Sequence, residues 1–234
     1  MSAETPSTAS STGSTSPSPT LSVRPPGATE AQRWAAALGD DHAPAQQDPP
    51  RSRFAWCVSG SGHYLEESMA LAARLPQVDL FLSAAADEVL PLYGLRIEAL
   101  KERFRVFRDK SASAVPVGRL YLEAYHTVVI APATSNTVAK CALGISDTLP
   151  TNMFAQAGKL GVPSLVFACD TEPVVITKGP RTTQDEWFTL RPRNIDLAQV
   201  ERLREIDHCA VLRSPEELEA ALAARLAALK LSWL

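Results

Sequence analysis

The chain has 234 residues, of which 45% are hydrophobic and 21% charged, and its formal net charge is −3. This composition is typical of a globular protein with one main domain. The sequence has no basic run for nucleic acid, no apolar run of about 20 residues for a membrane span and no secretory leader. We therefore expect a cytoplasmic protein that binds neither nucleic acid nor membrane.

The N-terminal segment differs in composition from the rest of the chain. Residues 2–27 consist almost entirely of Ser, Thr, Pro, Ala, Gly and Glu, with too few apolar side chains to offset the entropy of ordering. Residues 29–38 have the pattern of one short helix with Thr29 as its cap, and residues 40–53 are again polar and rich in proline. The sequence thus predicts a disordered extension over residues 1–52 and a folded domain over residues 53–234.

From Phe54 onward, short apolar runs alternate with segments of helical periodicity. Strands are expected at residues 54–60, 78–86, 104–107, 127–131, 164–169 and 209–212, and helices at 66–75, after the second strand, and at 134–143, 152–160 and 214–230. The alternation predicts an α/β fold, a flavodoxin- or Rossmann-like doubly wound parallel sheet with helices on both faces. Residues 174–177 and 186–190 flank Lys178-Gly179-Pro180 and predict a small β-hairpin.

The cysteines do not form a metal-binding pattern. No two of Cys57, Cys141, Cys169 and Cys209 lie within four residues of each other, which excludes zinc-type and iron–sulfur spacing. Three of the four lie in or beside apolar strand runs. We expect buried, reduced thiols and no metal.

Ligands of doubly wound sheets bind beyond the carboxyl ends of the strands, so the loops there are candidate sites. The first is Ser59-Gly60-Ser61-Gly62-His63, which suits either a phosphate at a helix N-terminus or a tight turn without a ligand. The second begins with Ser83-Ala84 and leaves room beside one hydroxyl, although it also suits a plain helix start. The third, residues 111–118, begins with Ser111-Ala112 and could wrap a ligand or act as a linker.

The fourth loop lies within residues 131–156 and carries the densest set of small polar groups. Pro132-Ala133 follows the predicted strand, and Thr134-Ser135-Asn136-Thr137 opens the next helix, with Thr134 or Ser135 as its cap. A second polar helix start, Ser146-Asp147, follows within ten residues of Thr137. The spacing favours the rim of a ligand pocket over an ordinary connection between strand and helix.

This loop resembles a motif of the homo-oligomeric flavin-containing Cys decarboxylase family. The segment Pro132-Ala133-Thr134-Ser135-Asn136-Thr137-Val138-Ala139-Lys140, followed by Gly144-Ile145-Ser146-Asp147, is similar to the family pattern, and the resemblance spans about residues 54–215. It implies a flavodoxin-like FMN fold and a homo-oligomer built from trimers. The FMN-binding residues that we carry over or place beside these motifs are Ser59, Gly60, Ser61, Gly62, Ser83, Ala84, Ser111, Ala112, Pro132, Ala133, Thr134, Ser135, Asn136 and Thr137.

Two departures from the family pattern indicate which branch the chain resembles. The helix after the second strand reads DEVLPLYGL and lacks the decarboxylases' His, and residues 167–173 lack their Met-Asn substrate clamp. The CDTEP turn, the segment 192–196 and the hairpin between them are most similar to the dihydromethanopterin reductase branch. The resemblance implies a flavin-dependent oxidoreductase of one-carbon metabolism. Dihydromethanopterin would be reduced to tetrahydromethanopterin by hydride transfer from FMN N5, with NAD(P)H or another donor re-reducing the flavin.

The catalytic residues stay unassigned. By position, Asp170, Glu172, His63 and Lys178 are candidates for the proton donor to the pterin substrate, although each also suits a surface salt bridge or a solvated loop. Lys178 and Arg181 on the hairpin could attract an anionic substrate tail, or could simply keep its tip soluble. Three alternatives remain open: a flavin prenyltransferase or decarboxylase-like enzyme, a non-catalytic flavin-binding regulatory subunit, and an electron-transfer partner of an iron–sulfur protein.

Overall fold

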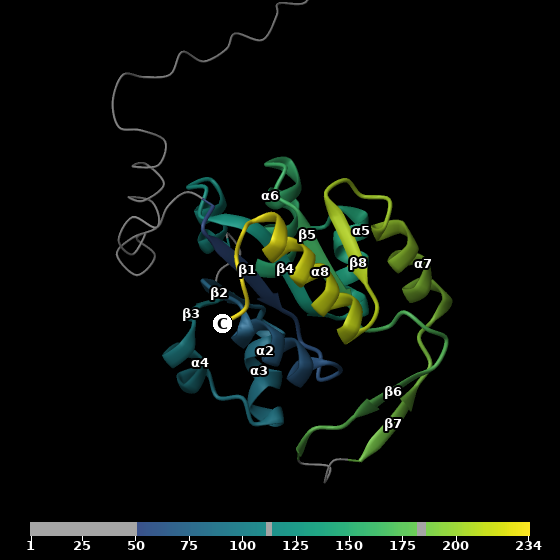
Figure 1. The fold of residues 1–234 in the computed structure, drawn as a ribbon. Coiled ribbons are helices and arrows are strands. Elements are labelled where there is room, and N and C mark those ends of the chain that lie inside the picture. Colours follow the sequence, from purple (N-terminus) through teal and green to yellow (C-terminus); the bar gives the residue numbers. More distant parts are fainter. Residues whose placement is uncertain (1–50, 111–113, 182–185) are drawn as a thin grey trace, which may run out of the picture.

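The computed structural model describes residues 51–110, 114–181 and 186–234 (Figure 1). The predicted extension up to residue 50, including the expected helix at residues 29–38, lies outside the described residues, as do Ser111 and Ala112. The boundary of the folded domain near residue 53 therefore stays a prediction, although the first strand does begin at Arg53.

The described domain is built on one parallel sheet, as predicted. Its six strands lie in the order β3-β2-β1-β4-β5-β8, and every neighbouring pair is parallel. The strand order reverses beside β1, between β1 and β4, which is the switch point of a doubly wound sheet. The strands are β1 (Arg53–Val58), β2 (Val78–Leu82), β3 (Arg105–Arg108), β4 (Tyr125–Ala133), β5 (Ser164–Ala168) and β8 (Cys209–Leu212).

Strand β4 is longer than predicted. It is buried along its whole length and includes Pro132, which the sequence had placed after the strand. A proline has no N–H to donate to a neighbouring strand. The pairing with β5 accordingly shifts between Ile130 and Ala133 and resumes where Ala133 meets Ala168. The strand thus carries the chain directly to the candidate loop.

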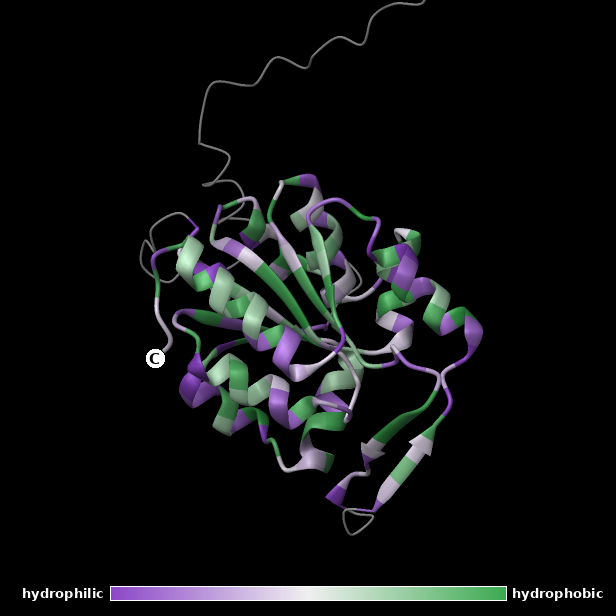
Figure 2. Ribbon diagram, turned by 45° about the vertical axis from the view of Figure 1, so that its right-hand side comes forward, coloured by the Kyte–Doolittle hydropathy of each residue, from purple (hydrophilic) through white to green (hydrophobic). Residues whose placement is uncertain are grey.

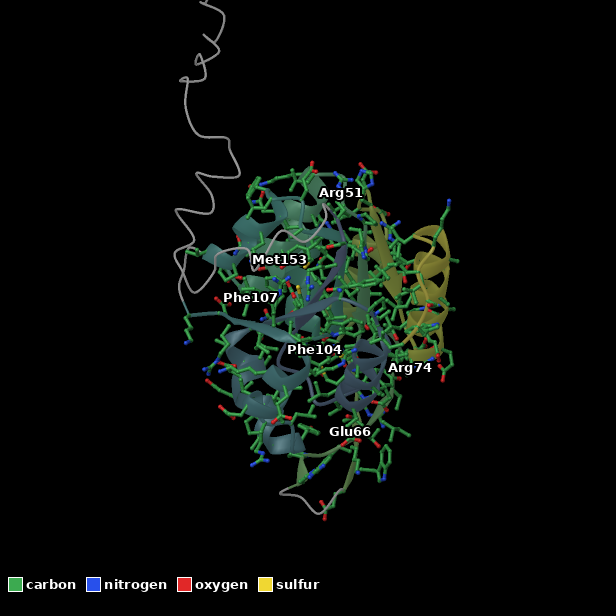
Figure 3. The ribbon with its side chains drawn as sticks, turned by 60° about the vertical axis from the view of Figure 1, so that its left-hand side comes forward. Arg51, Glu66, Arg74, Phe104, Phe107 and Met153 are labelled. Carbon is green, nitrogen blue, oxygen red and sulfur yellow. The ribbon has the colours of Figure 1, made fainter. Side chains whose placement is uncertain are left out.

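Helices cover both faces of the sheet, and the strand side chains alternate between two cores. Phe54, Trp56 and Val58 pack on one side, together with residues of the helices labelled α2 and α8, and Cys57 points to the other side with residues of α5, α6 and α7. Figure 2 shows the apolar strands between these two helical layers. Figure 3 shows the same division at the sheet edge, where Phe104 lies on one side and Phe107 and Met153 lie on the other. The helical elements are α2 (Leu65–Arg74), α3 (Ala84–Val89), η2 (Leu90–Tyr93), α4 (Ile97–Arg103), η3 (Val115–Leu120), α5 (Ser135–Leu143), α6 (Leu149–Lys159), α7 (Asn194–Leu203) and α8 (Pro215–Ala228).

The helix starts follow local capping chemistry, with one correction to the sequence prediction. Thr134 caps α5 and Ser214 caps α8, as expected. The predicted position of the next helix start was wrong, because Thr148 caps α6 rather than Ser146 or Asp147. There the Thr148 and Thr151 side chains each accept from the other residue's backbone N–H. Helix α6 therefore begins at Leu149 rather than Asn152, and α7 was not predicted at all.

The predicted hairpin is present and extends from the sheet domain (Figures 1 and 2). Strand β6 (Val175–Lys178) pairs antiparallel with β7 (Trp187–Leu190). All four residues of β7 are exposed, including an apolar Trp187 and Phe188. The hairpin thus offers apolar surface that its own fold does not cover.

The buried side chain of His126 should make the stability of the domain depend on pH. His126 is 4% exposed, its ring meets Phe54 edge-on, and Arg225 donates to its carbonyl oxygen. Burial, and then the charge of Arg225, lowers the pKa of His126 from 6.5 to about 4. As pH falls, the unfolded chain therefore binds this proton before the folded chain does.

Neutral His126 should contribute fully to the free energy of unfolding above pH 6.5. We expect that contribution to be lost as the pH falls towards 4. The loss should be about 1–3 kcal/mol, seen as a lower free energy of unfolding in urea titrations. His126→Asn, which cannot titrate there, should flatten the pH profile in this window. An equally steep profile in the variant would contradict the assignment.

Candidate functional site

The carboxyl ends of β1 and β4 are joined through Ser59. Its backbone N–H and its hydroxyl both donate to the carbonyl oxygen of Pro132, at 3.3 and 2.7 Å, and its Oγ accepts from the backbone N–H of Thr134 at 2.9 Å. Ser59 is buried, so these bonds satisfy groups that water cannot reach. The predicted site residue Ser59 therefore fixes the two loops to each other rather than pointing into solvent.

The small residues of the first loop are explained by what packs against them. A Cβ atom on Gly60 would lie 2.6 Å from the Cβ of Ala85, and one on Gly62 would lie 1.8 Å from the hydroxyl of Tyr93. Ser83 donates its backbone N–H to the Val58 carbonyl at 3.1 Å and caps α3 through its side chain. The first and second predicted loops are thus in direct contact.

The N-terminus of α5 faces this same edge of the sheet. Thr134 caps the helix, accepting from the backbone N–H of Thr137 at 3.2 Å, and Ser135 donates to the carboxylate of Asp170. The side chain of Asn136 is exposed. A helix start of this kind offers backbone N–H groups and the positive end of the helix dipole to an anion.

Cys169, which was predicted from the sequence only to be a buried thiol, connects the end of β5 to the site. The Cys169 backbone N–H donates to the Ala133 carbonyl at 3.0 Å, and its sulfur donates to the Ser61 hydroxyl at 3.2 Å. Burial raises the pKa of Cys169 to about 12, so the group is a thiol at neutral pH. Its contacts support the loop over residues 61–63, a role that spacing alone could not indicate.

The end of β3 is anchored near the site as well. The Asp109 carboxylate accepts from the backbone N–H of Leu149 at 2.7 Å, at the N-terminus of α6, and Arg108 pairs with Asp87 at 2.5 Å. The third predicted loop therefore starts from a fixed point, although its Ser111 and Ala112 lie outside the described residues.

The four candidate proton donors differ in surroundings. His63 is half-buried, and its Nε2 has no hydrogen-bond partner in the described part of the chain. Burial lowers the pKa of His63, while the charges of Asp170 and Glu67 oppose that shift. Asp170 is bonded to Ser135, Glu172 is exposed, and Lys178 lies half-buried on the hairpin. His63 therefore combines a position in the first loop with a ring nitrogen that is buried and has no partner among the described residues.

Two cavities lie near these elements. One, of about 390 Å³, is bounded by Gly62, His63 and Tyr64 on the loop, by the start of α2, by Tyr93, and by the hairpin. The other, of about 520 Å³, lies among α5, α6 and residues 205–207. The larger cavity is lined by none of the predicted FMN residues, so size alone does not identify the site.

Within ranges 51–110, 114–181 and 186–234, no three His, Cys, Asp or Glu side chains gather closely enough to hold a metal ion. No helix in the same ranges combines the length and apolar character needed to cross a bilayer.

Comparison with known proteins gives consistent matches. A family model described as Flavoprotein matches residues 42–229. The structure of Burkholderia xenovorans DmrB in complex with FMN, described as a cubic protein cage for redox transfer, superposes with a TM-score of 0.72. The two chains are 64% identical, and the match covers 79% of this chain and 100% of that one.

Two curated proteins also match. The uncharacterized protein MJ0730 of Methanocaldococcus jannaschii is 36% identical over 180 residues, which is 73% of this chain and 94% of that protein. The dihydromethanopterin reductase (acceptor) of Methanosarcina mazei is 39% identical over 142 residues, or 55% of this chain and 59% of that protein. The chain therefore spans little more than half the length of that reductase.

Proposed function

The chain belongs to the Flavoprotein family, and from this premise we propose that it is an FMN-dependent oxidoreductase that reduces dihydromethanopterin to tetrahydromethanopterin. The observation that carries the proposal is the 64% identity to a redox protein crystallised with FMN, over the whole of that protein. The curated reductase that matches part of the chain supports the pterin as substrate.

The groups at the carboxyl edge of the sheet suit FMN chemically. A flavin phosphate needs hydrogen-bond donors and positive potential, and the capped starts of α3 and α5 supply both. We propose that the first turns behind Ser83 and Thr134, together with the loop at Gly60 to Gly62, hold the phosphate and ribityl chain. We also propose that Asn136, which is exposed, hydrogen-bonds a polar edge of the ring.

The chain's own residues would orient the reactants and supply a proton. When bound, FMN would supply the hydride that, with one proton, reduces a C=N bond of the dihydropterin, and NAD(P)H or another donor would return two electrons. His63 is our candidate for holding that proton, because it lines the cavity beside the first loop and its lowered pKa favours release. The same pKa means that at neutral pH protonated His63 is a minor form.

We further propose that the protein works in the cytoplasm as a homo-oligomer built from trimers. The related B. xenovorans protein is described as a cage, which supports an assembly of several copies.

The proposal is tested by following the flavin anaerobically. The purified protein is reduced with NADH, NADPH or dithionite until the flavin absorbance bleaches, and is then mixed with dihydromethanopterin. We expect the absorbance to return as tetrahydromethanopterin forms, and to stay bleached with buffer alone. A flavin that stays reduced in the presence of the pterin would exclude the reductase function while leaving FMN binding intact.

A further inference from the structure

The cavity between the first loop and the hairpin has a lining that suits a particular ring. We infer that this cavity, of about 390 Å³, binds the 2-amino-4-oxopyrimidine ring of the dihydropterin, with Glu67 as the acceptor for its ring N–H and amino group. The inference rests on the proposed function and adds the place and the contacts of the second substrate.

The cavity lies next to the first loop. Gly62 and His63 line it and also belong to the loop assigned to FMN, so a ring bound here lies beside the cofactor. The Tyr93 hydroxyl lies where a Cβ of Gly62 would stand, so the cavity wall touches the loop directly. Hydride transfer requires the pterin to bind beside the cofactor, and this cavity adjoins the loop that would hold it.

The cavity has an aromatic lining. Tyr64 is held in place because its ring stacks on the core residue Phe167, with centroids 4.9 Å apart, and packs against the ring of His63, with centroids 3.7 Å apart. Across the cavity Trp187 on β7 is 70% exposed, an unusual state for an indole on a strand. A flat heteroaromatic ring bound in the cavity would cover the exposed indole face and gain stacking contacts with it.

Acidic side chains line the cavity and determine which flat ring it can bind. Glu66 and Glu67 stand in the first turn of α2, and Figure 3 shows Glu66 at the end of the domain from which the hairpin extends. A 2-amino-4-oxopyrimidine presents two parallel N–H donors, which one carboxylate can accept together. We choose Glu67 because it lines the cavity together with His63 and Tyr64, and its charge raises the pKa of both.

The hairpin places two cationic side chains in the lining of the same cavity. Lys178 and Arg181 line the cavity opposite the acidic turn, and the Arg181 guanidinium lies against Gly94. An acidic tail carried by the pterin would meet these two side chains while its ring meets Glu67. A nicotinamide ring lacks the paired donors, so the carboxylate should favour the pterin over NAD(P)H.

The test compares Glu67→Gln with a matched control. Glu98→Gln changes an acid in the first turn of α4, which does not line the cavity. We expect Glu67→Gln to raise KM for dihydromethanopterin about tenfold or more, since a charge-assisted pair of hydrogen bonds is lost. FMN content and the rate of flavin reduction by the donor should not change, and Glu98→Gln should behave as wild type.

A second pair of variants tests the stacking wall. Trp187→Ala should raise the same KM, whereas Phe188→Ala, its neighbour on β7 that does not line the cavity, should not. Unchanged KM in both Glu67→Gln and Trp187→Ala, or a change in donor kinetics instead, would overturn the inference. If wild-type reduced flavin is not reoxidised by dihydromethanopterin, the proposed function fails first and this assignment fails with it.

Discussion

Replacing Asp79 with alanine should lower the free energy of unfolding by about 3–5 kcal/mol. Asp79 on β2 is fully buried and accepts hydrogen bonds from Arg53 at 2.9 Å, Arg105 at 2.8 Å and the Tyr125 hydroxyl at 2.8 Å. Arg119 donates to the same Tyr125 hydroxyl at 2.9 Å and is itself only 3% exposed. Removing the carboxylate leaves cationic and hydroxyl groups without their shared acceptor in a site that water reaches poorly.

The loss should be seen as a lower midpoint in urea titrations with an unchanged slope. The matched control is Glu201→Ala, which removes an exposed acid paired with Arg204 at 3.4 Å and should cost no more than about 0.5 kcal/mol. Equal effects of the two substitutions would contradict the view that the buried carboxylate ties β1, β2, β3 and β4 together at the amino ends of the strands.

The second large effect should come from Gly60→Val, which we expect to weaken FMN binding about tenfold or more without unfolding the domain. Even a Cβ at this position would lie 2.6 Å from the Ala85 Cβ, so the loop after β1 must move away from the start of α3. Overpacking of this kind costs about 1–3 kcal/mol, and each 1.4 kcal/mol is tenfold in affinity. The measurement is the dissociation constant of FMN, with circular dichroism as the check on folding.

Gly158→Ala is the matched control, because a Cβ at Gly158 would meet nothing within 4 Å. This variant should bind FMN as wild type does, and should be more stable by about 0.5–1 kcal/mol because alanine favours the helix. Gly60→Val with wild-type affinity for FMN would show that the contact between the two loops does not shape the site.

The sheet was predictable because its signals are local. Apolar runs such as residues 54–58 and 165–168 are buried on both faces of the sheet, and such burial requires a continuous run of apolar residues in the sequence. The cap at Ser214 was equally clear, because a cap needs only its own few residues. By contrast, Thr148 was missed because Ser146 and Asp147 offer similar capping chemistry two and one positions earlier.

Long-range contacts were not predictable in the same way. The bonds from Ser59 to Pro132 and from Cys169 to Ser61 join residues 73 and 108 positions apart, and no local pattern specifies such partners. The cavity beside Gly62 depends on Tyr93 and Trp187, which only the folded chain brings together. The list of FMN-binding residues itself stays a prediction.

Equilibrium titration of the flavin-free protein with FMN, and in parallel with riboflavin, tests the central claim most directly. With a phosphate held at the helix starts behind Ser83 and Thr134, FMN should bind saturably with one molecule per chain. It should also bind about a hundredfold or more tighter than riboflavin, which lacks the phosphate. The absence of saturable binding, or equal affinity for the two flavins, would contradict the account.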